Sequence, residues 1–376
     1  MTQSVVTEEL DAGAGLKIGH AELNVATTLN SLSLEMVRAL TQQLNAWQDR
    51  EDLAAVLITG AGDRAFCAGG DIQALYHAIT RNHQAQAVVD SYPFDFFAEE
   101  YRLDYAIHTY PKPVLTIGHG VVMGGGLGIF SASSHRVATE TSRLAVPEIT
   151  IGLFPDAGAT WSLGRMPQHW ASFLGMTDSH INAADALATG LATHCVSQAE
   201  RQQMIADLQT LSWQANAADN HLLLDAYLAG QVVPELPASE LDKVPARSVH
   251  VDDFAREVAA LKSLAGASKW VDRGLGNLTN GCPTTAGIVL EQLRRVGELS
   301  LADSFRLELT VATHCANNTD FREGVRALLI EKDNAPAWKF GNLDGLQWDH
   351  VLSHFEAPWD VHPLADLGGD NERRTA

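Results

Sequence analysis

The chain has 376 residues, 46% of them hydrophobic and 19% charged, which supplies a large core and excludes a globally disordered protein. Its 26 lysines and arginines face 46 aspartates and glutamates, and the net charge of −20 excludes general affinity for nucleic acid or an anionic membrane. We find no secretory signal, no basic transit peptide and no apolar run of membrane-spanning length. We therefore expect a cytoplasmic protein that contacts neither nucleic acid nor membrane.

The chain lacks the common motifs of metal, disulfide and phosphate sites. Its four cysteines, Cys67, Cys195, Cys282 and Cys315, form no C-x-x-C pair and no metal-ligand spacing. There is also no G-x-G-x-x-G after a strand, no phosphate loop ending in G-K-[ST], no G-x-S-x-G and no H-E-x-x-H. We expect reduced thiols and no metal or redox cofactor.

The N-terminal half alternates between strand and helix patterns. Near-alternate apolar residues predict a hairpin over 16–29, helical spacing predicts a helix over 32–47, and a β-branched apolar run predicts a buried strand over 54–59. A helical stretch over 71–109 precedes a strand over 113–117; further short strands are expected at 136–138 and 142–145, and a short helix at 183–192. These patterns predict an α/β spiral of repeated strand-strand-helix turns over residues 16–228.

The C-terminal part changes character after a proline-rich stretch. Residues 229–250 contain Pro234, Pro237 and Pro245 among polar residues and are predicted to form a linker. Residues 251–355 show helical spacing and are predicted to form a helical region, with helices over 254–264, 285–296, 302–315 and 320–330. We expect the tail, 356–376, to be flexible and to carry no chemistry.

Two glycine-rich segments follow predicted strands and precede predicted helices. The first is A-F-C-A-G-G-D-I at 65–72, and the second is M-G-G-G-L-G at 123–128. A helix N-terminus offers free N–H donors, and glycines allow a ligand carbonyl to approach the backbone closely. Side by side, the two turns can supply two N–H groups to one oxyanion. The alternative is that the glycines only permit tight turns.

A third segment, 146–158, places Glu148 and Asp156 in an apolar stretch bounded by prolines. Carboxyl groups in such surroundings are either hydrogen-bonded or have raised pKa values suited to proton transfer or attack. The alternative assigns Asp156 to a helix cap and Glu148 to a structural role.

In this order, the three segments closely resemble the enoyl-CoA hydratase/isomerase (crotonase) superfamily, and within it the branch that hydrolyses 3-hydroxyacyl-CoA thioesters. The F-A-E-E-Y segment at 97–101 and the F-R-E-G-V-R-A segment at 321–327 extend the resemblance to about residues 16–340. The resemblance implies a crotonase-like spiral and hydrolysis of a short 3-hydroxyacyl-CoA. We expect 3-hydroxyisobutyryl-CoA, an intermediate of valine degradation, and no cofactor besides the CoA of the substrate.

The resemblance also implies roles for individual residues. The N–H groups of Gly70 and Gly125 would form the oxyanion hole, Glu148 would act on the acyl group as nucleophile or base, and Asp156 would be its partner. Glu100 would lie near the substrate hydroxyl. Ala68 and Asp71, beside the first glycine pair, are further predicted substrate contacts.

Position 128 argues against hydration of a double bond. Hydratases of the superfamily carry the first of two catalytic glutamates two residues after the triple glycine, where this chain has Gly128. Isomerase or weak hydratase activity, and a non-catalytic acyl-CoA-binding subunit, remain the alternatives. A homo-oligomer is possible because superfamily members often form trimers or hexamers, but the helical C-terminal region could instead cover the protein's own site.

Two side chains near the glycine segments are predicted to be structural. His119, between two glycines, is expected to be a buried imidazole bonded to backbone. Cys67 is expected to be a small buried apolar side chain, because no histidine motif lies near it.

Overall fold

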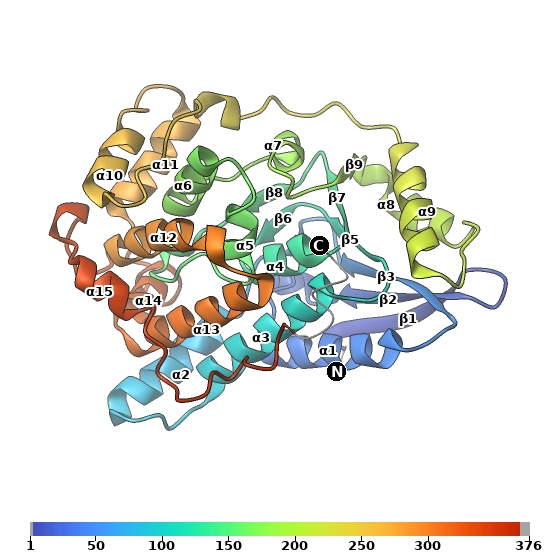
Figure 1. The fold of residues 1–376 in the computed structure, drawn as a ribbon, viewed down its shortest axis with the longest axis horizontal. Helices are drawn as coiled ribbons and strands as arrows, with labels where there is room; N and C mark the ends of the chain where they lie inside the picture. Colours follow the sequence, from blue (N-terminus) through green and yellow to red (C-terminus); the bar gives the residue numbers. More distant parts are fainter. Residues whose placement is uncertain (1–2, 369–376) are drawn as a thin grey trace.

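The computed structural model describes residues 3–368 and contains two sheets wrapped by helices (Figure 1). The six-stranded sheet has the order β1-β2-β3-β5-β7-β9, and the three-stranded sheet has the order β4-β6-β8. All strand pairs are parallel except β1 with β2. The strands are β1 (Val5–Asp11), β2 (Lys17–Leu23), β3 (Leu53–Gly60), β4 (Ala65–Cys67), β5 (Val114–Gly118), β6 (Val121–Met123), β7 (His135–Thr139), β8 (Arg143–Ala145) and β9 (His194–Val196).

The helices divide into those of the strand-rich half and those that follow it. The first group is α1 (Leu34–Gln48), α2 (Ile72–Ala85), α3 (Tyr92–His108), α4 (Gly125–Ala132), α5 (Ala159–Leu163), α6 (Gln168–Thr177), α7 (Ala183–Ala188), α8 (Arg201–Leu208) and α9 (Ala217–Ala229). The second is α10 (Phe254–Lys262), α11 (Lys269–Asn280), α12 (Pro283–Arg295), α13 (Leu301–Asn317), α14 (Asp320–Val325) and α15 (Trp348–Ser353). The predicted α/β spiral with a helical C-terminal region is confirmed.

Each face of the six-stranded sheet contributes to a different core. On β3, Val56 and Ile58 point into the main core, whereas Ala54 and Leu57 point into a smaller core under α8 and α9. These two helices, yellow in Figure 1, cover the outer face of the sheet. Because both faces of β3 are covered, the strand reads as a continuous apolar run, as expected for a parallel sheet.

The hairpin predicted over 16–29 is wrong in its second strand. Residues 17–23 form β2, but its antiparallel partner is β1, which precedes the predicted hairpin. The turn lies at Gly13 and Gly15, whose φ values of 73° and 82° favour glycine. The segment predicted as the second strand instead contains a 3₁₀ turn, η1 (Ala26–Thr28).

Several other sequence predictions are refined by the structure. The helical stretch 71–109 is two helices, α2 and α3, and the helix predicted over 320–330 ends as a π-helical turn at Arg326–Ile330. The helices predicted over 32–47, 254–264, 285–296 and 302–315 are confirmed to within a few residues. The sequence patterns do not predict the helices α8, α9 and α11.

The proline-rich segment 229–250 packs closely against the helices around it. Leu241 and Val244 are buried, and the Val244 carbonyl accepts a hydrogen bond of 3.3 Å from the Trp170 indole. Arg247 makes a bidentate ion pair with the buried Glu257 of α10, at 2.9 and 2.6 Å. The segment thus links α6 of the strand-rich half with α10 of the C-terminal region.

The start of the predicted tail is also attached to the body. Arg102 of α3 pairs with Asp366 at 2.7 Å, and Leu364 is fully buried. Residues 369–376 of the predicted tail lie outside the described residues. Within 3–368, no helix has the length and apolar character needed to cross a bilayer.

The Arg247–Glu257 pair gives a test of how the 229–250 segment is attached. Arg247→Met leaves a buried carboxylate without its cation, and we expect a loss of about 3 kcal/mol in the free energy of unfolding. Arg38→Met, which removes an exposed pair with Glu99, is the matched control and should change stability little. Urea unfolding of both variants measures the difference, and equal stabilities would contradict the assignment.

Candidate active site

The two glycine loops lie side by side because the strands that lead into them, β4 and β6, are paired in parallel. A Cβ at Gly69 would lie 3.4 Å from the Met123 carbonyl oxygen, which shows how close the loops approach. Gly70 lies just before α2, and Gly125 is the first residue of α4. Neither N–H donates a hydrogen bond to another group in residues 3–368, so both are free to bind a ligand oxygen.

A cavity of about 480 Å³, including its open mouth, joins these loops to the predicted carboxyl groups. Its polar lining consists of the glycine loops and three acidic side chains, Glu100, Glu148 and Asp156. Its apolar lining comes largely from α2, α3 and the segment that follows Glu148: Ile72, Leu75, Phe96, Phe97, Pro147, Ile151 and Leu153. The structure therefore brings together six of the seven predicted site residues: Ala68, Gly70, Glu100, Gly125, Glu148 and Asp156.

Glu148 begins a 3₁₀ turn, η2 (Glu148–Thr150), directly after β8 and Pro147. Its carboxyl group is buried, and a Cβ on Gly124 would lie 3.5 Å from its Oε1. Its Oε2 has no hydrogen-bond partner within the described part of the chain. Burial, followed by the nearby Asp156, raises the pKa of Glu148 well above its usual range.

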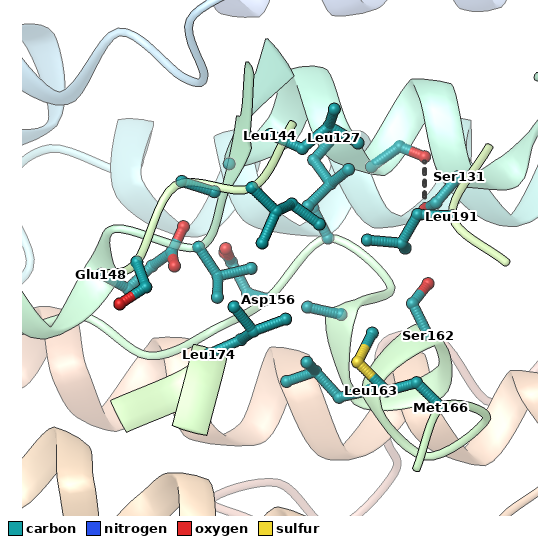
Figure 2. A pocket seen from close by; sticks show the side chains of 18 residues that line it. Leu127, Ser131, Leu144, Glu148, Asp156, Ser162, Leu163, Met166, Leu174 and Leu191 are labelled. Atoms are coloured by element: carbon teal, nitrogen blue, oxygen red, sulfur yellow. Dashed lines mark hydrogen bonds between the residues drawn. The ribbon is translucent and has the colours of Figure 1, made fainter. Parts of the chain in front are cut away.

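Asp156 lines the same cavity and accepts a hydrogen bond from one side chain. The Tyr101 hydroxyl of α3 donates to Asp156 Oδ2 at 2.6 Å. Burial raises the pKa of Asp156 to about 7, and the hydrogen bond from Tyr101 opposes that rise. Figure 2 shows Glu148 and Asp156 near each other among the side chains that line a second, more apolar pocket.

Helices from the C-terminal region fix the loop that carries Asp156. Glu308 of α13 accepts hydrogen bonds from the N–H groups of Gly158 and Thr160, both at 2.8 Å. Gln292 of α12 donates to the Pro155 carbonyl at 2.9 Å, and the Thr285 hydroxyl donates to the Leu153 carbonyl. The C-terminal helices therefore help to form the chain's own site. This agrees with the expectation that the helical C-terminal region could cover the site of the same chain.

Glu100 projects from α3 toward the second glycine loop. A Cβ on Gly125 would overlap its carboxyl group, so only glycine leaves room for this contact. Burial, and then Asp156 and Glu308, raise the pKa of Glu100 well above its usual range. Glu100 Oε1 makes no hydrogen bond to any residue in 3–368, which leaves it available to a substrate hydroxyl.

The absence of cations distinguishes these carboxyl groups from two other buried acids, Glu257 and Glu291. Elsewhere, the buried Glu257 pairs with Arg247, the buried Glu291 pairs with Arg294 and Arg295, and the pKa of each glutamate is lowered. No lysine or arginine of the described residues forms an ion pair with Glu100, Glu148, Asp156 or Glu308. Perturbed carboxyl groups that converge on a cavity indicate a site for proton transfer or attack.

The remaining predicted residues lie at the edge of the site or outside it. Ala68 lines the cavity, but Asp71 does not line it, and its side chain caps α2 by accepting from the Ala74 N–H at 3.1 Å. His119 is buried and bonded to the Gly62 carbonyl at 2.8 Å, which confirms its predicted structural role. Cys67 is buried, and burial raises the pKa of its thiol to about 12, as expected for an unreactive side chain.

The sequence analysis missed Tyr101, Gln292 and Glu308. The pattern contained a signal for Glu308, because it lies at helical spacing on the apolar stripe that includes Phe305 and Ala312. A charged residue on a buried helix face indicates a specific partner. The identity of that partner, a loop 150 residues earlier, is visible only in the structure.

Comparisons with known proteins agree with this geometry. The family model described as enoyl-CoA hydratase/isomerase matches residues 18–355. The chain belongs to the enoyl-CoA hydratase/isomerase family. It is 35% identical to the mitochondrial 3-hydroxyisobutyryl-CoA hydrolase of Xenopus laevis over 343 residues, covering 90% of this chain and 86% of that protein. The human mitochondrial 3-hydroxyisobutyryl-CoA hydrolase is 31% identical over 342 residues, with the same coverage.

Solved structures of family members have the same fold. A carnitinyl-CoA dehydratase from Mycobacterium thermoresistibile superposes with a TM-score of 0.83 at 30% identity, covering 97% of this chain and 99% of that one. An enoyl-CoA hydratase from Rhodobacter sphaeroides superposes with a TM-score of 0.80 at 27% identity, covering 95% and 98%. The fold thus occurs in family members named for different reactions, so side chains must decide the chemistry.

The resemblance assigns the first hydratase glutamate to position 128, and the structure leaves no room for a glutamate there. A Cβ on Gly128 would lie 2.8 Å from the Cβ of Ala157 and 2.9 Å from Oδ2 of Asp104. We expect Gly128→Glu to lose about 2 kcal/mol or more of stability through overpacking and to gain no hydratase activity on an enoyl-CoA.

Gly276→Glu in α11 is the matched control, because nothing lies within 4 Å of a Cβ built at that helical glycine. Thermal unfolding of the two variants and hydration of crotonyl-CoA are the measurements. A Gly128→Glu protein as stable as the Gly276→Glu protein would show that the site has room for the hydratase glutamate.

Proposed function

We propose that this family member hydrolyses a short 3-hydroxyacyl-CoA thioester, with 3-hydroxyisobutyryl-CoA as the substrate, giving 3-hydroxyisobutyrate and free CoA. The observation that carries the proposal is the convergence of Glu148, Asp156 and Glu100 on one cavity beside two free backbone N–H groups. The similarity to 3-hydroxyisobutyryl-CoA hydrolases supports this substrate. The reaction places such a protein in valine degradation.

The thioester carbonyl oxygen would lie between the N–H groups of Gly70 and Gly125. These donors are fixed in place before the substrate binds, so they stabilise the developing oxyanion without reorganising. Loss of one such donor typically costs about 3 kcal/mol of transition-state stabilisation. Both donors come from backbone, so the acidic surroundings do not require a buried cation to hold the carbonyl.

Glu148 would act on the carbonyl carbon, either by direct attack or by taking a proton from the attacking water. Its raised pKa increases its basicity, which favours both routes. Asp156, held by Tyr101, would orient Glu148 or the water. Glu100 would bind the 3-hydroxyl group through its unpartnered Oε1, which would favour hydroxylated acyl chains.

Isomerisation is the second candidate, since a single glutamate suffices to move a proton along an acyl chain. Glu148 alone would serve that reaction, but it would leave Asp156 and Glu100 without a role. A non-catalytic acyl-CoA-binding subunit would leave all three buried carboxyl groups unexplained. The proposed cytoplasmic location and any homo-oligomer rest on the sequence alone, and the named relatives are mitochondrial proteins.

Release of free thiol from 3-hydroxyisobutyryl-CoA tests the proposal, with crotonyl-CoA and acetyl-CoA in parallel. We expect rapid release from the hydroxylated substrate, and a fall in kcat of about a hundredfold or more in Glu148→Gln with KM little changed. Glu100→Gln should reduce discrimination between 3-hydroxyisobutyryl-CoA and isobutyryl-CoA. Undiminished hydrolysis by Glu148→Gln would contradict the mechanism.

A single turnover in H₂¹⁸O distinguishes the two roles of Glu148. If Glu148 attacks the carbonyl, a mixed anhydride forms; water that then attacks the Glu148 carbonyl carbon leaves the label on the enzyme, and the acid of the first turnover carries an unlabelled oxygen from Glu148. If Glu148 activates water, the label appears directly in the acid. Mass spectrometry of the acid and of the Glu148 peptide reads both outcomes.

The Tyr101–Asp156 hydrogen bond predicts a shift in the pH profile. The pKa of Asp156 is raised to about 7, so activity that needs its carboxylate is lost as the pH falls through that value. Tyr101→Phe removes a donor that favours the ionised form, so the pKa rises further and the acid limb of kcat/KM should move to higher pH. Tyr110→Phe, which breaks a hydrogen bond to the Leu44 carbonyl far from the cavity, is the control. An acid limb that stays in place or moves to lower pH would contradict this reading.

A further inference from the structure

Three polar residues of α3 form a stripe that extends behind the proposed site. Glu100, Asp104 and His108, here called the α3 stripe, are four residues apart and therefore lie one above the next on one helix face. Glu100 belongs to the cavity, but Asp104 and His108 have no place in the mechanism described above. The stripe therefore connects the carboxyl groups of the cavity to a different part of the protein.

The stripe contains an unusual number of unsatisfied polar atoms. Asp104 is fully buried, yet neither of its carboxyl oxygens has a hydrogen-bond partner among residues 3–368. The same is true of Glu100 Oε1 and His108 Nε2. Because an unpaired buried carboxyl oxygen is costly, groups of this kind call for an unseen partner such as ordered water.

The opposing surface is made of glycines, so the stripe faces backbone without side chains. A Cβ on Gly125 would overlap Glu100, a Cβ on Gly128 would lie 2.9 Å from Asp104 Oδ2, and a Cβ on Gly158 would lie 3.6 Å from His108 Nε2. These glycines belong to α4 and to the loop held by Glu308. Side chains at any of them would occupy the space beside the stripe.

The far end of the stripe reaches a surface groove. His108 is half-buried: its Nε2 is enclosed, while its ring lines a groove with Arg136, Trp161 and Arg165. Burial, and then Arg136 and Arg165, lower the pKa of His108 to about 3, so the imidazole is neutral. A neutral imidazole can accept a proton at one nitrogen and release one from the other. On its inner side, the ring packs against Phe305.

The proposed reaction creates a need for such a connection. Hydrolysis of a thioester consumes one water and yields a carboxylate, a thiol and one proton, since the acid ionises at neutral pH and the thiol does not. That proton is left on buried carboxyl groups at the inner end of the cavity. With CoA in the mouth of the cavity, that proton would have no direct contact with bulk water.

We propose that Asp104 and His108 hold a file of water molecules that carries this proton from the catalytic carboxyl groups to the groove. Four residues of helix rise about 6 Å, a gap that one water bridges with two hydrogen bonds. The proton moves from Glu148 or Asp156 through Glu100 and water to Asp104, then through water to His108 Nε2, and His108 releases another proton into the groove. Only O–H and N–H bonds form and break, so no oxidant or co-reactant is needed.

The inference rests on the proposed hydrolysis, and thiol-release kinetics test it. Proton release follows cleavage of the C–S bond, so His108→Ala and Asp104→Asn should keep the first-turnover burst of thiol and kcat/KM. Steady-state kcat should fall on the order of tenfold. Imidazole added to His108→Ala should restore kcat through the groove, whereas a packing defect would not respond to imidazole.

His169→Ala, which removes a histidine of α6 outside the cavity and the groove, is the matched control and should behave as wild type with or without imidazole. A slowed burst in Asp104→Asn, or an unchanged kcat in both stripe variants, would overturn the relay. If the wild-type protein releases no thiol at all, it is the proposed hydrolysis that fails.

A crystal structure of the wild-type protein that resolves water gives a readout independent of activity. Ordered water between Glu100 and Asp104, and between Asp104 and His108, is the expected result. Dry contacts along the stripe would overturn the proposal whatever substrate the protein acts on.

Discussion

The burial of carboxyl groups without a buried cation is the constraint on which the rest of this structure depends. Their exposed fractions are small: Glu100 2%, Asp104 0%, Glu148 3%, Asp156 7% and Glu308 0%. Five ionised carboxylates in such a volume would repel one another strongly, so the group must share protons or be neutralised by hydrogen bonds. Backbone N–H groups and one tyrosine hydroxyl supply the donors, and the raised pKa values follow from the lack of any stronger partner.

This constraint explains why the C-terminal helices are part of the catalytic unit. Glu308 occupies two N–H groups that would otherwise be orphans at the start of α5, and Gln292 and Thr285 hold carbonyls of the same loop. The hydrogen-bond partners of this loop therefore lie on α12 and α13, more than 130 residues further along the chain. A spiral core without these helices would leave Asp156 on a loop with unsatisfied backbone.

Much of the fold and part of the site were predictable from the sequence. What could be predicted and what could not differ for a physical reason. Strand runs such as 54–59, the two glycine turns and the carboxyl pair of the third segment are local patterns, and the family resemblance assigned them roles. The turn at Gly13 and Gly15 was missed because the short strand before it has a mostly exposed face. Tyr101, Gln292 and Glu308 could not be assigned, because their function lies in contacts between distant segments that no local period encodes.

The same contacts explain how this scaffold differs from a hydratase. A hydratase needs a second glutamate on α4 at position 128, but here α3 fills that space from the opposite side, with Asp104 Oδ2 only 2.9 Å from where a Cβ of residue 128 would lie. Two buried carboxyl groups, Glu100 and Asp104, thus lie on α3, whereas α4 carries none. In the proposed reaction they would bind a hydroxyl group and accept a proton, the two tasks that hydrolysis of a 3-hydroxyacyl thioester adds to carbonyl activation.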